Sequence, residues 1–334
     1  MSFDKEFKIF YENISLTDKK KDDLLSSKEA LRNKIRTSFD DNGRKKPKFY
    51  SQGSFSMKTT VLAPTPECTD YDIDDGIYLQ NIDTSKPVGE WEVTPEEAQD
   101  WVYDAVKDHT KDGAEKKKKC VRVLYKGEKH VDLPIYAKKD EKHYVAVKNE
   151  GWIESNPSGI NDWFKERIKE HGEQLRRVVK YLKAWKENRH CNNKSLEFWG
   201  GFQLTVLVGM YFQGNSDDDE QAFYETIRNI NSNLIFHPPL NSPVSPYHDT
   251  LSHYSDTKNR KFKEEFKTLT DKSKTAYEET DCQKKAEKWK EIFGNRFPNI
   301  SKEECDKKIE KSSKAAPAII TGTGSIKSMS NQLA

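Results

Sequence analysis

The stretch Gln52–Thr60, QGSFSMKTT, followed by Tyr71–Leu79, YDIDDGIYL, carries the most informative pattern in the chain. Because side chains alternate between the two faces of a β-strand, Asp72 and Asp74 are expected to point the same way and Asp75 the opposite way. Two carboxylates about 7 Å apart on one face repel each other unless a cation lies between them. The pattern therefore favours a metal site, although alternating acids without a function are common on surface strands.

A third carboxylate, Asp132, lies in another short apolar run, HVDLPIY (130–136). If this strand neighbours the first, the three carboxylates can hold two Mg²⁺ ions, with Mn²⁺ as the alternative ion, because both prefer oxygen ligands. Upstream, Gly53 and Ser54 form a turn whose N–H groups and hydroxyl can contact a phosphate. A Gly–Ser pair alone is more often an ordinary turn, so the hypothesis depends on the combination.

Composition argues against a chain that binds nucleic acid through its overall charge. The 334 residues include 57 Lys and Arg against 55 Asp and Glu, which gives a net charge of +2. Such a balance exerts little long-range attraction on a polyanion, so stable nucleic-acid binding is not expected. The basic runs Lys19–Lys21 and Lys116–Lys119 are interpreted first as solvated faces, with a phosphate-facing role for one of them as the alternative.

The cysteine pattern predicts free thiols in a reducing cytoplasm. The number is odd, and no two are close in sequence: Cys68, Cys120, Cys191, Cys282 and Cys305. His190 and Cys191 have no further Cys or His nearby at metal-ligand spacing, which argues against zinc. The N-terminus lacks the features of a signal peptide, and no apolar run approaches a membrane span. A soluble, cytoplasmic protein without a membrane partner is expected.

The order of helical and strand-like segments predicts an α+β fold. Helices are expected over 1–14, where Phe3, Phe7, Phe10 and Ile14 share one face, and over 17–39, with either Thr17 or Ser15 as cap. The next hundred residues contain short alternating or β-branched runs, a helix over Pro95–Val106, and a hairpin turning at Lys126–Glu128. This block is predicted to form a mixed sheet.

The rest of the chain is predicted to be mostly helical. Helices are expected over 158–170, 173–188, 202–212, 258–270 and 277–293, the last ending at Gly294, with a proline-rich connection over 238–246. We therefore predict a nucleotide-binding core with N-terminal helices over 1–155, a helical domain over 156–311 and a flexible tail over 312–334. The active site is expected in the cleft between core and helical half.

The quoted segments resemble a known superfamily. QGSFSMKTT, DYDIDDGIYL and HVDLPIY are similar to the GS…DxD…D signature of the DNA polymerase β-like nucleotidyltransferases, which include poly(A) polymerase and oligoadenylate synthase. Farther along, QLRRVVKYLKAWK, FQLTVLV and WKEIFGNRFP resemble the bacterial CD-NTases, the cyclic-oligonucleotide synthases of CBASS anti-phage systems. The resemblance runs from about residue 45 to 300 and implies a polymerase β-like sheet packed against an oligoadenylate synthase-like helical half.

This resemblance implies roles for individual residues. Gly53 and Ser54 would bind the triphosphate of the donor nucleotide, and Asp72 and Asp74 would hold both metal ions. Asp132 would hold the catalytic metal and help to activate the acceptor hydroxyl. Lys183, in YLKAW, would reach the β- and γ-phosphates, although without the family a solvent-facing helix lysine is the simpler interpretation.

Two departures from the family pattern are visible. Lys58 stands where members often have glycine, and Gly200-Gly201 stands where they often have a serine near a helix start.

The resemblance also implies partners and leaves alternatives open. ATP and other nucleoside triphosphates would be the substrates, joined into a cyclic di- or trinucleotide for anti-phage defence. A ubiquitin-ligase-like enzyme could conjugate the chain through Ala334, although an ordinary frayed terminus is at least as good an interpretation. An RNA- or protein-modifying nucleotidyltransferase, or a catalytically inactive nucleotide-binding module, remain alternatives. Base specificity is expected to depend on the helical half and the 241–251 connection.

Overall fold

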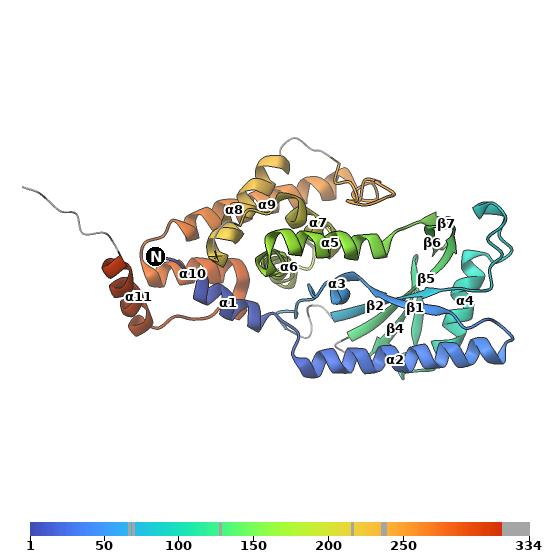
Figure 1. Cartoon of the computed structure of the whole chain (residues 1–334). Helices are drawn as coiled ribbons and strands as arrows, with labels where there is room; N and C mark the ends of the chain where they lie inside the picture. The colour runs from blue at the N-terminus through green and yellow to red at the C-terminus, as the bar shows by residue number, and fades with distance from the viewer. Residues whose placement is uncertain (66–67, 69–70, 127–128, 215–216, 235–238, 316–334) are drawn as a thin grey trace, which may run out of the picture.

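The computed structural model of the chain describes residues 1–65, 68, 71–126, 129–214, 217–234 and 239–315, with the backbone alone for 311–315. A β-sheet with two covering helices occupies one half, and a bundle of helices occupies the other (Figure 1). The predicted α+β class is therefore confirmed. A cleft between the sheet and the helical half is lined by residues of both.

The described strands form one mixed sheet. Its path runs β1 (Lys48–Gln52), β2 (Tyr71–Tyr78), β5 (Lys129–Lys139), β4 (Cys120–Tyr125) and β3 (Ala114–Lys116), and β6 (Lys142–Val147) joins β5 to β7 (Gly151–Glu154). β2 and β5 run parallel, and the other described pairs run antiparallel. The expected hairpin connects β4 and β5, although Gly127 and Glu128 themselves lie outside the described residues.

Two helices cover one face of this sheet. α2 (Asp18–Asp41) runs beneath the strands in Figure 1, and α4 (Pro95–Val106) lies beside it. α2 contacts β2 and β5, α4 contacts β3, β4 and β6, and apolar side chains of both helices share one core with the sheet. Thr17 caps α2, and Thr94 forms a capping box with Glu97 at the start of α4, as predicted. Because α2 and α4 occupy this face, the opposite face is left for α3 (Gly53–Ser56) and the helical half.

The helical half contains more helix than the sequence predicted. It comprises α5 (Pro157–His171), α6 (Glu173–Asn192), α7 (Gly201–Tyr211), α8 (Asp219–Leu234), α9 (Asp256–Tyr277), α10 (Cys282–Phe293) and α11 (Lys302–Ala315). Short 3₁₀ turns lie at Val88–Glu90 and Gly294–Arg296. α8 and α11 were not expected, and α11 covers 312–315 of the predicted tail; residues 316–334, including Ala334, lie outside the description. Among the described helices, none combines the length and apolar composition needed to cross a bilayer.

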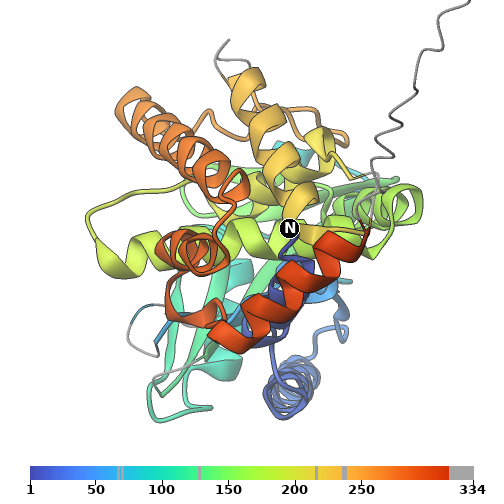
Figure 2. The same cartoon turned by 90° about the vertical axis from the view of Figure 1, so that its left-hand side faces the viewer.

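The first helix packs with the helical half rather than with the sheet. Phe3, Phe7, Phe10 and Ile14 of the segment around α1 (Asp4–Asn13) are fully buried in the same apolar core as α6, α8 and α10. Figure 2 shows the N-terminus next to α11. The chain therefore begins in the helical half and crosses to the sheet with α2, while the predicted limits at 155 and 311 stay predictions.

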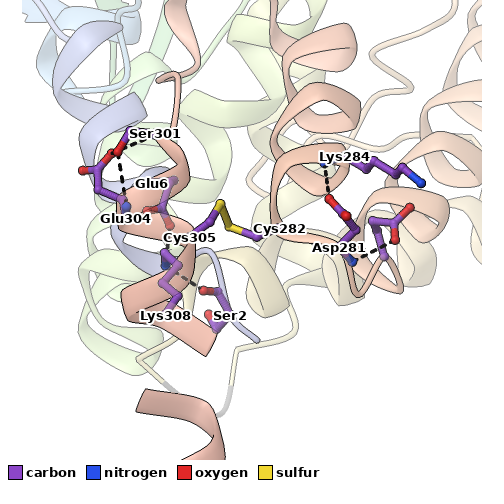
Figure 3. The surroundings of a disulfide bond; sticks show 10 residues. Ser2, Glu6, Asp281, Cys282, Lys284, Ser301, Glu304, Cys305 and Lys308 are labelled. Carbon is purple, nitrogen blue, oxygen red and sulfur yellow. Dashed lines mark hydrogen bonds and ion pairs between the residues drawn. A yellow bond between two sulfur atoms is a disulfide. The ribbon is translucent and has the colours of Figure 1, made fainter. Parts of the chain in front are cut away.

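Four of the five cysteines are paired, so the prediction of free thiols is wrong for them. Cys282 at the start of α10 bonds Cys305 of α11 with a Cα–Cα distance of 5.7 Å (Figure 3), and Cys68 bonds Cys191 at 5.1 Å. Cys120 is the free cysteine. Cys282 and Cys305 are 23 residues apart in sequence, and Cys68 and Cys191 are 123 apart, so only the tertiary fold reveals that they meet.

We expect Phe7→Ala to lower the free energy of unfolding by about 3–5 kcal/mol, because the truncation empties a site packed among aromatic rings. The Phe7 ring lies 4.9–5.9 Å, centroid to centroid, from Trp289, Tyr181, Phe297, Phe293 and Phe223. Ile9→Ala on the same helix is the matched control, since Ile9 is 39% exposed, and should change stability by about 0.5 kcal/mol or less. Urea unfolding of both variants checks this; equal losses would contradict the placement of α1.

Candidate active site

The turn between β1 and β2 is shaped by one close approach. Gly53 begins α3 with φ +69°, a conformation that favours glycine. A Cβ added at this position would lie 2.0 Å from Oδ2 of Asp74. Only glycine therefore lets the backbone turn directly against the Asp74 carboxylate. The neighbouring Ser54 hydroxyl lies 2.9 Å from Oγ1 of Thr60 and donates to Oδ1 of Asp72 at 3.5 Å. Sequence reasoning proposed this turn, and the structure places it beside both strand aspartates.

The parallel register of β2 and β5 brings the predicted carboxylates together. Asp74 lies opposite Asp132, and Asp72 lies opposite His130. One ligand atom each from Asp72, His130 and Asp132 lies within 4.8 Å of the other two. His130 Nε2 is 3.9 Å from Oδ2 of Asp72 and 3.8 Å from Oδ2 of Asp132. Asp75, as expected from its parity, faces the other side and is fully buried.

The carboxylates on β2 are held in an unfavourable electrostatic environment. Burial raises the pKa of Asp72, which Asp132 raises further and His130 opposes. Burial also raises the pKa of Asp74 well above its usual value, and the charges of Asp72 and Asp132 add to that rise. By accessible surface both residues are half-buried, the Asp72 side chain being 36% exposed, and clustered acids of this kind are stabilised by a cation between them. The donor set, with oxygens and one imidazole nitrogen, fits a divalent metal ion.

Two residues that the sequence reasoning missed complete this cluster. Arg122 on β4 lies directly across from Asp132, and its Nε and Nη2 donate to the two carboxylate oxygens, both at 2.8 Å. His130 precedes Asp132 by two positions, so it shares a face with that residue. The alternation in CVRVLY and HVDLPIY could have placed both residues on the face of Asp132. It could not have shown which partner strand lay beside each.

Lys183 approaches the site from the helical half. Its helix α6 buries one face in the apolar core, and the lysine itself is 6% exposed, which excludes the solvent-facing interpretation. Its ammonium donates to Oγ1 of Thr59 at 2.9 Å and to the Thr59 carbonyl oxygen at 3.3 Å. Burial lowers the pKa of Lys183 to about 7, and the negative charge of Asp72 opposes this shift. A buried amine that is only partly protonated at neutral pH thus lies near the strand aspartates.

A cleft of about 1100 Å³ joins these elements. Its walls include the Gly53–Ser54 turn, Asp72, Asp74, Lys183 and the start of α7. The connection expected to contact bases also lines the cleft, through Ser242, Val244, Ser245, Pro246, His248, Asp249 and Thr250. The structure thus places the glycine turn, β2, α6 and the 242–250 connection around one cleft.

The two departures from the family pattern have structural counterparts. Lys58 has φ +57°, in the left-handed region where glycine is favoured, so the position retains the backbone conformation without the residue. Gly201 begins α7 and lines the cleft, and a Cβ there would lie 3.4 Å from Cε of Lys183. A serine at Gly201 would therefore contact the lysine side chain.

We expect Asp74→Asn to stabilise the protein in EDTA at neutral pH by about 1–3 kcal/mol, because it removes a buried charge repelled by two others. The pKa of Asp74 is higher in the folded than in the unfolded chain, so the folded protein loses stability as pH rises through that value. The advantage of the variant should accordingly vanish as pH falls toward about 4. Thermal melts from pH 4 to 8 measure it.

Asp75→Asn is the matched control for this prediction. The adjacent carboxylate accepts two 2.6 Å hydrogen bonds from Arg32, so losing its charge should destabilise the fold. The same sign of effect at Asp74 and Asp75 would contradict the electrostatic description.

Comparisons with known proteins agree with this geometry. The family model for the nucleotidyltransferase domain of cyclic GMP-AMP synthase DncV-like proteins matches residues 47–136. A cyclic GMP-AMP synthase of Escherichia albertii is 29% identical over 230 residues, which cover 67% of this chain and 49% of that protein. A cyclic AMP-AMP-AMP synthase of Acinetobacter sp. is 28% identical over 155 residues, or 45% of this chain and 44% of that protein. The chain thus spans about half the length of these relatives.

A solved structure shares the fold over most of its length. Vibrio cholerae DncV cyclic AMP-GMP synthase, in complex with the linear intermediate 5′ pppA(3′,5′)pG, superposes with a TM-score of 0.71 at 18% identity. The match covers 88% of this chain and 96% of that one. The segment 47–136 contains the glycine turn and all three aspartates. Over this segment, the chain matches the nucleotidyltransferase domain of cyclic GMP-AMP synthase DncV-like proteins.

Proposed function

We propose that this protein joins nucleoside triphosphates into a cyclic di- or trinucleotide. The observation that carries the proposal is the placement of Asp72 and Asp74 in one cleft with the Gly53 turn and Lys183, while Asp132 lies opposite Asp74 on β5 and close to Asp72. The relatives that match the chain are named as synthases of cyclic GMP-AMP and of cyclic AMP-AMP-AMP. A cyclic product is therefore favoured over a linear one, and its size is left open.

The arrangement assigns a task to each side chain. Asp72, Asp74 and Asp132 would hold two Mg²⁺ ions, which supply charge neutralisation at the phosphates and activation of the attacking hydroxyl. The N–H groups of the Gly53–Ser54 turn would contact the donor triphosphate. Lys183 would donate to its β- and γ-phosphates, whose negative charge favours the protonated amine despite burial.

The chemistry follows from this positioning. A ribose hydroxyl of the acceptor attacks the α-phosphorus of the donor, a new phosphodiester forms, and pyrophosphate leaves. The hydroxyl proton passes toward the aspartate cluster. A second round within the linear product closes the ring. The cleft of about 1100 Å³ supports this scheme, because pockets for a single ligand are usually about 300–1,000 Å³.

The alternatives are weaker for physical reasons. An RNA-tailing enzyme needs a basic path for a long acceptor, and the net charge of +2 offers no general attraction. An inactive binding module would have no reason to keep several acids close together at a cost in stability. A role in anti-phage defence and conjugation at Ala334 remain proposals supported by the family resemblance alone, since Ala334 lies outside the described residues.

We expect Asp72→Asn combined with Asp74→Asn to lower product formation by orders of magnitude, because charge neutralisation at the phosphates dominates this chemistry. Radiolabelled nucleoside triphosphates with Mg²⁺ provide the assay, and mass spectrometry of the phosphatase-resistant product identifies the ring. Asp83→Asn with Asp104→Asn removes two exposed carboxylates and should leave activity unchanged. Undiminished product from the first variant would rule out the assignment, and tailed species on adding RNA would favour the RNA-modifying alternative.

We expect Gly53→Ala to lower the rate about 100-fold, because the methyl group would displace the Asp74 carboxylate from its place in the cluster. Gly43→Ala is matched to it: Gly43 has φ +66°, yet no atom lies within 4 Å of an added Cβ. Both variants carry the same backbone strain of about 1 kcal/mol, so only the contact with Asp74 differs. Equal rates in steady-state assays of the two variants would contradict the role of the close approach.

A further inference from the structure

Arg122 binds the carboxylate of Asp132, which the proposed metal chemistry requires. It lies opposite Asp132 in the β4–β5 register and binds both of its oxygens at 2.8 Å. Side-chain exposure is 30% for Arg122 and 12% for Asp132. A bidentate pair of this kind is among the stronger side-chain contacts, so a cation that needs Asp132 must compete with the guanidinium.

The remaining charges make that competition harder for a bare metal ion. Three aspartates meet two basic side chains, the charged Arg122 and Lys183, and both lower the pKa of Asp72 and Asp74. A divalent ion arriving alone would displace Arg122 from Asp132 and then lie beside that guanidinium and the partly protonated Lys183. An ion arriving with a triphosphate brings enough negative charge to offset all of them, so it meets no such repulsion.

We propose that Arg122 is a positioning residue that makes metal binding at Asp132 conditional on nucleotide. In the ligand-free enzyme the guanidinium holds Asp132 and weakens its affinity for a lone divalent ion. With nucleotide bound, the phosphates supply the charge that lets a metal share the carboxylate. The inference rests on the proposed function, because it concerns the metal ions of that reaction.

A second pair in the same sheet provides a matched contrast. Arg32 on α2 binds both oxygens of Asp75 at 2.6 Å, on the face opposite the cleft. The Asp75 side chain is fully buried, and it lies outside the metal-compatible group of Asp72, His130 and Asp132. The Arg32–Asp75 pair has the same two-bond geometry as the Arg122–Asp132 pair, but we expect no metal ion to compete for Asp75.

The test is the affinity of the nucleotide-free protein for Mn²⁺, measured by electron paramagnetic resonance of unbound Mn²⁺. We expect Arg122→Gln to bind Mn²⁺ about tenfold more tightly than the wild type, a difference of about 1.4 kcal/mol. Arg122→Lys keeps the charge without the bidentate contact and should fall between them. Arg32→Gln should bind like the wild type, and thermal melts establish that each variant is folded.

The direction of the change separates this proposal from a purely structural role. If Arg122 only held Asp132 in place, its removal would loosen the carboxylate and weaken Mn²⁺ binding. Equal or weaker binding by folded Arg122→Gln would therefore overturn the proposal. Should that variant fail to fold, the same comparison applies to Arg122→Lys.

Coupling to nucleotide gives a second readout. Calorimetric titration with α,β-methylene-ATP, in EDTA and in Mn²⁺, measures how much the metal strengthens nucleotide binding. By thermodynamic reciprocity, this enhancement should be about tenfold smaller in Arg122→Gln than in the wild type. An unchanged enhancement would contradict the proposal. Neither measurement needs turnover, so failure to find a cyclic product would count against the proposed function and leave this test intact.

Discussion

The parallel pairing of β2 with β5 is the constraint on which the site depends. It sets Asp74 against Asp132 and Asp72 against His130, and the antiparallel pairing of β4 then adds Arg122 to the same row. A shift of one residue would turn Asp132 toward α2 and α4, because side chains alternate with a period of two. The apolar residues on the other face, such as Ile73, Val131 and Leu133, prevent that shift because they form the core under the helices.

The aspartates of the site repel one another, and this repulsion is the cost of holding several carboxylates where metal ions can bind. Asp72 and Asp74 are half-buried and repelled by Asp132, whereas Asp75, one position along, is satisfied by Arg32. Lys183 and Arg122 relieve part of the repulsion without removing it. Natural proteins tolerate such local cost when the rest of the fold over-determines the position of the strained groups. Here the packed sheet and its two covering helices provide that support.

The helical half fixes the second wall of the cleft through its aromatic core. α6 is anchored by Leu175, Val178 and Leu182, and the rings of α1, α8 and α10 pack around it. Lys183 projects from the same helix into the cleft, so its position relative to Thr59 depends on this packing. The first helix of the chain thus helps to position a residue more than 160 positions later.

Local patterns in the sequence were enough to predict most of the helices and strands and the face of β2 on which each aspartate lies. Alternation placed Asp72 and Asp74 together and Asp75 apart, Thr94 marked the start of α4, and the mixed sheet followed from the strand-like runs. These predictions succeeded because they depend on spacing along one segment. α8 was missed although Phe223, Ile227, Ile230 and Leu234 recur at helical spacing and predict a helix. α11 offers a weaker pattern, because Cys305 is buried but Ile309 is 52% exposed.

Only the tertiary structure decided which distant residues meet. The partnership of Arg122 with Asp132, the entry of His130 into the acidic cluster and the pairing of four cysteines all depend on strand register or helix packing. The need for glycine at position 53 likewise depends on where the Asp74 carboxylate lies. The sequence by itself thus determined which side chains could do the chemistry. The distances between these side chains and the shifts of their pKa values had to come from the fold, because both depend on segments that no local pattern connects.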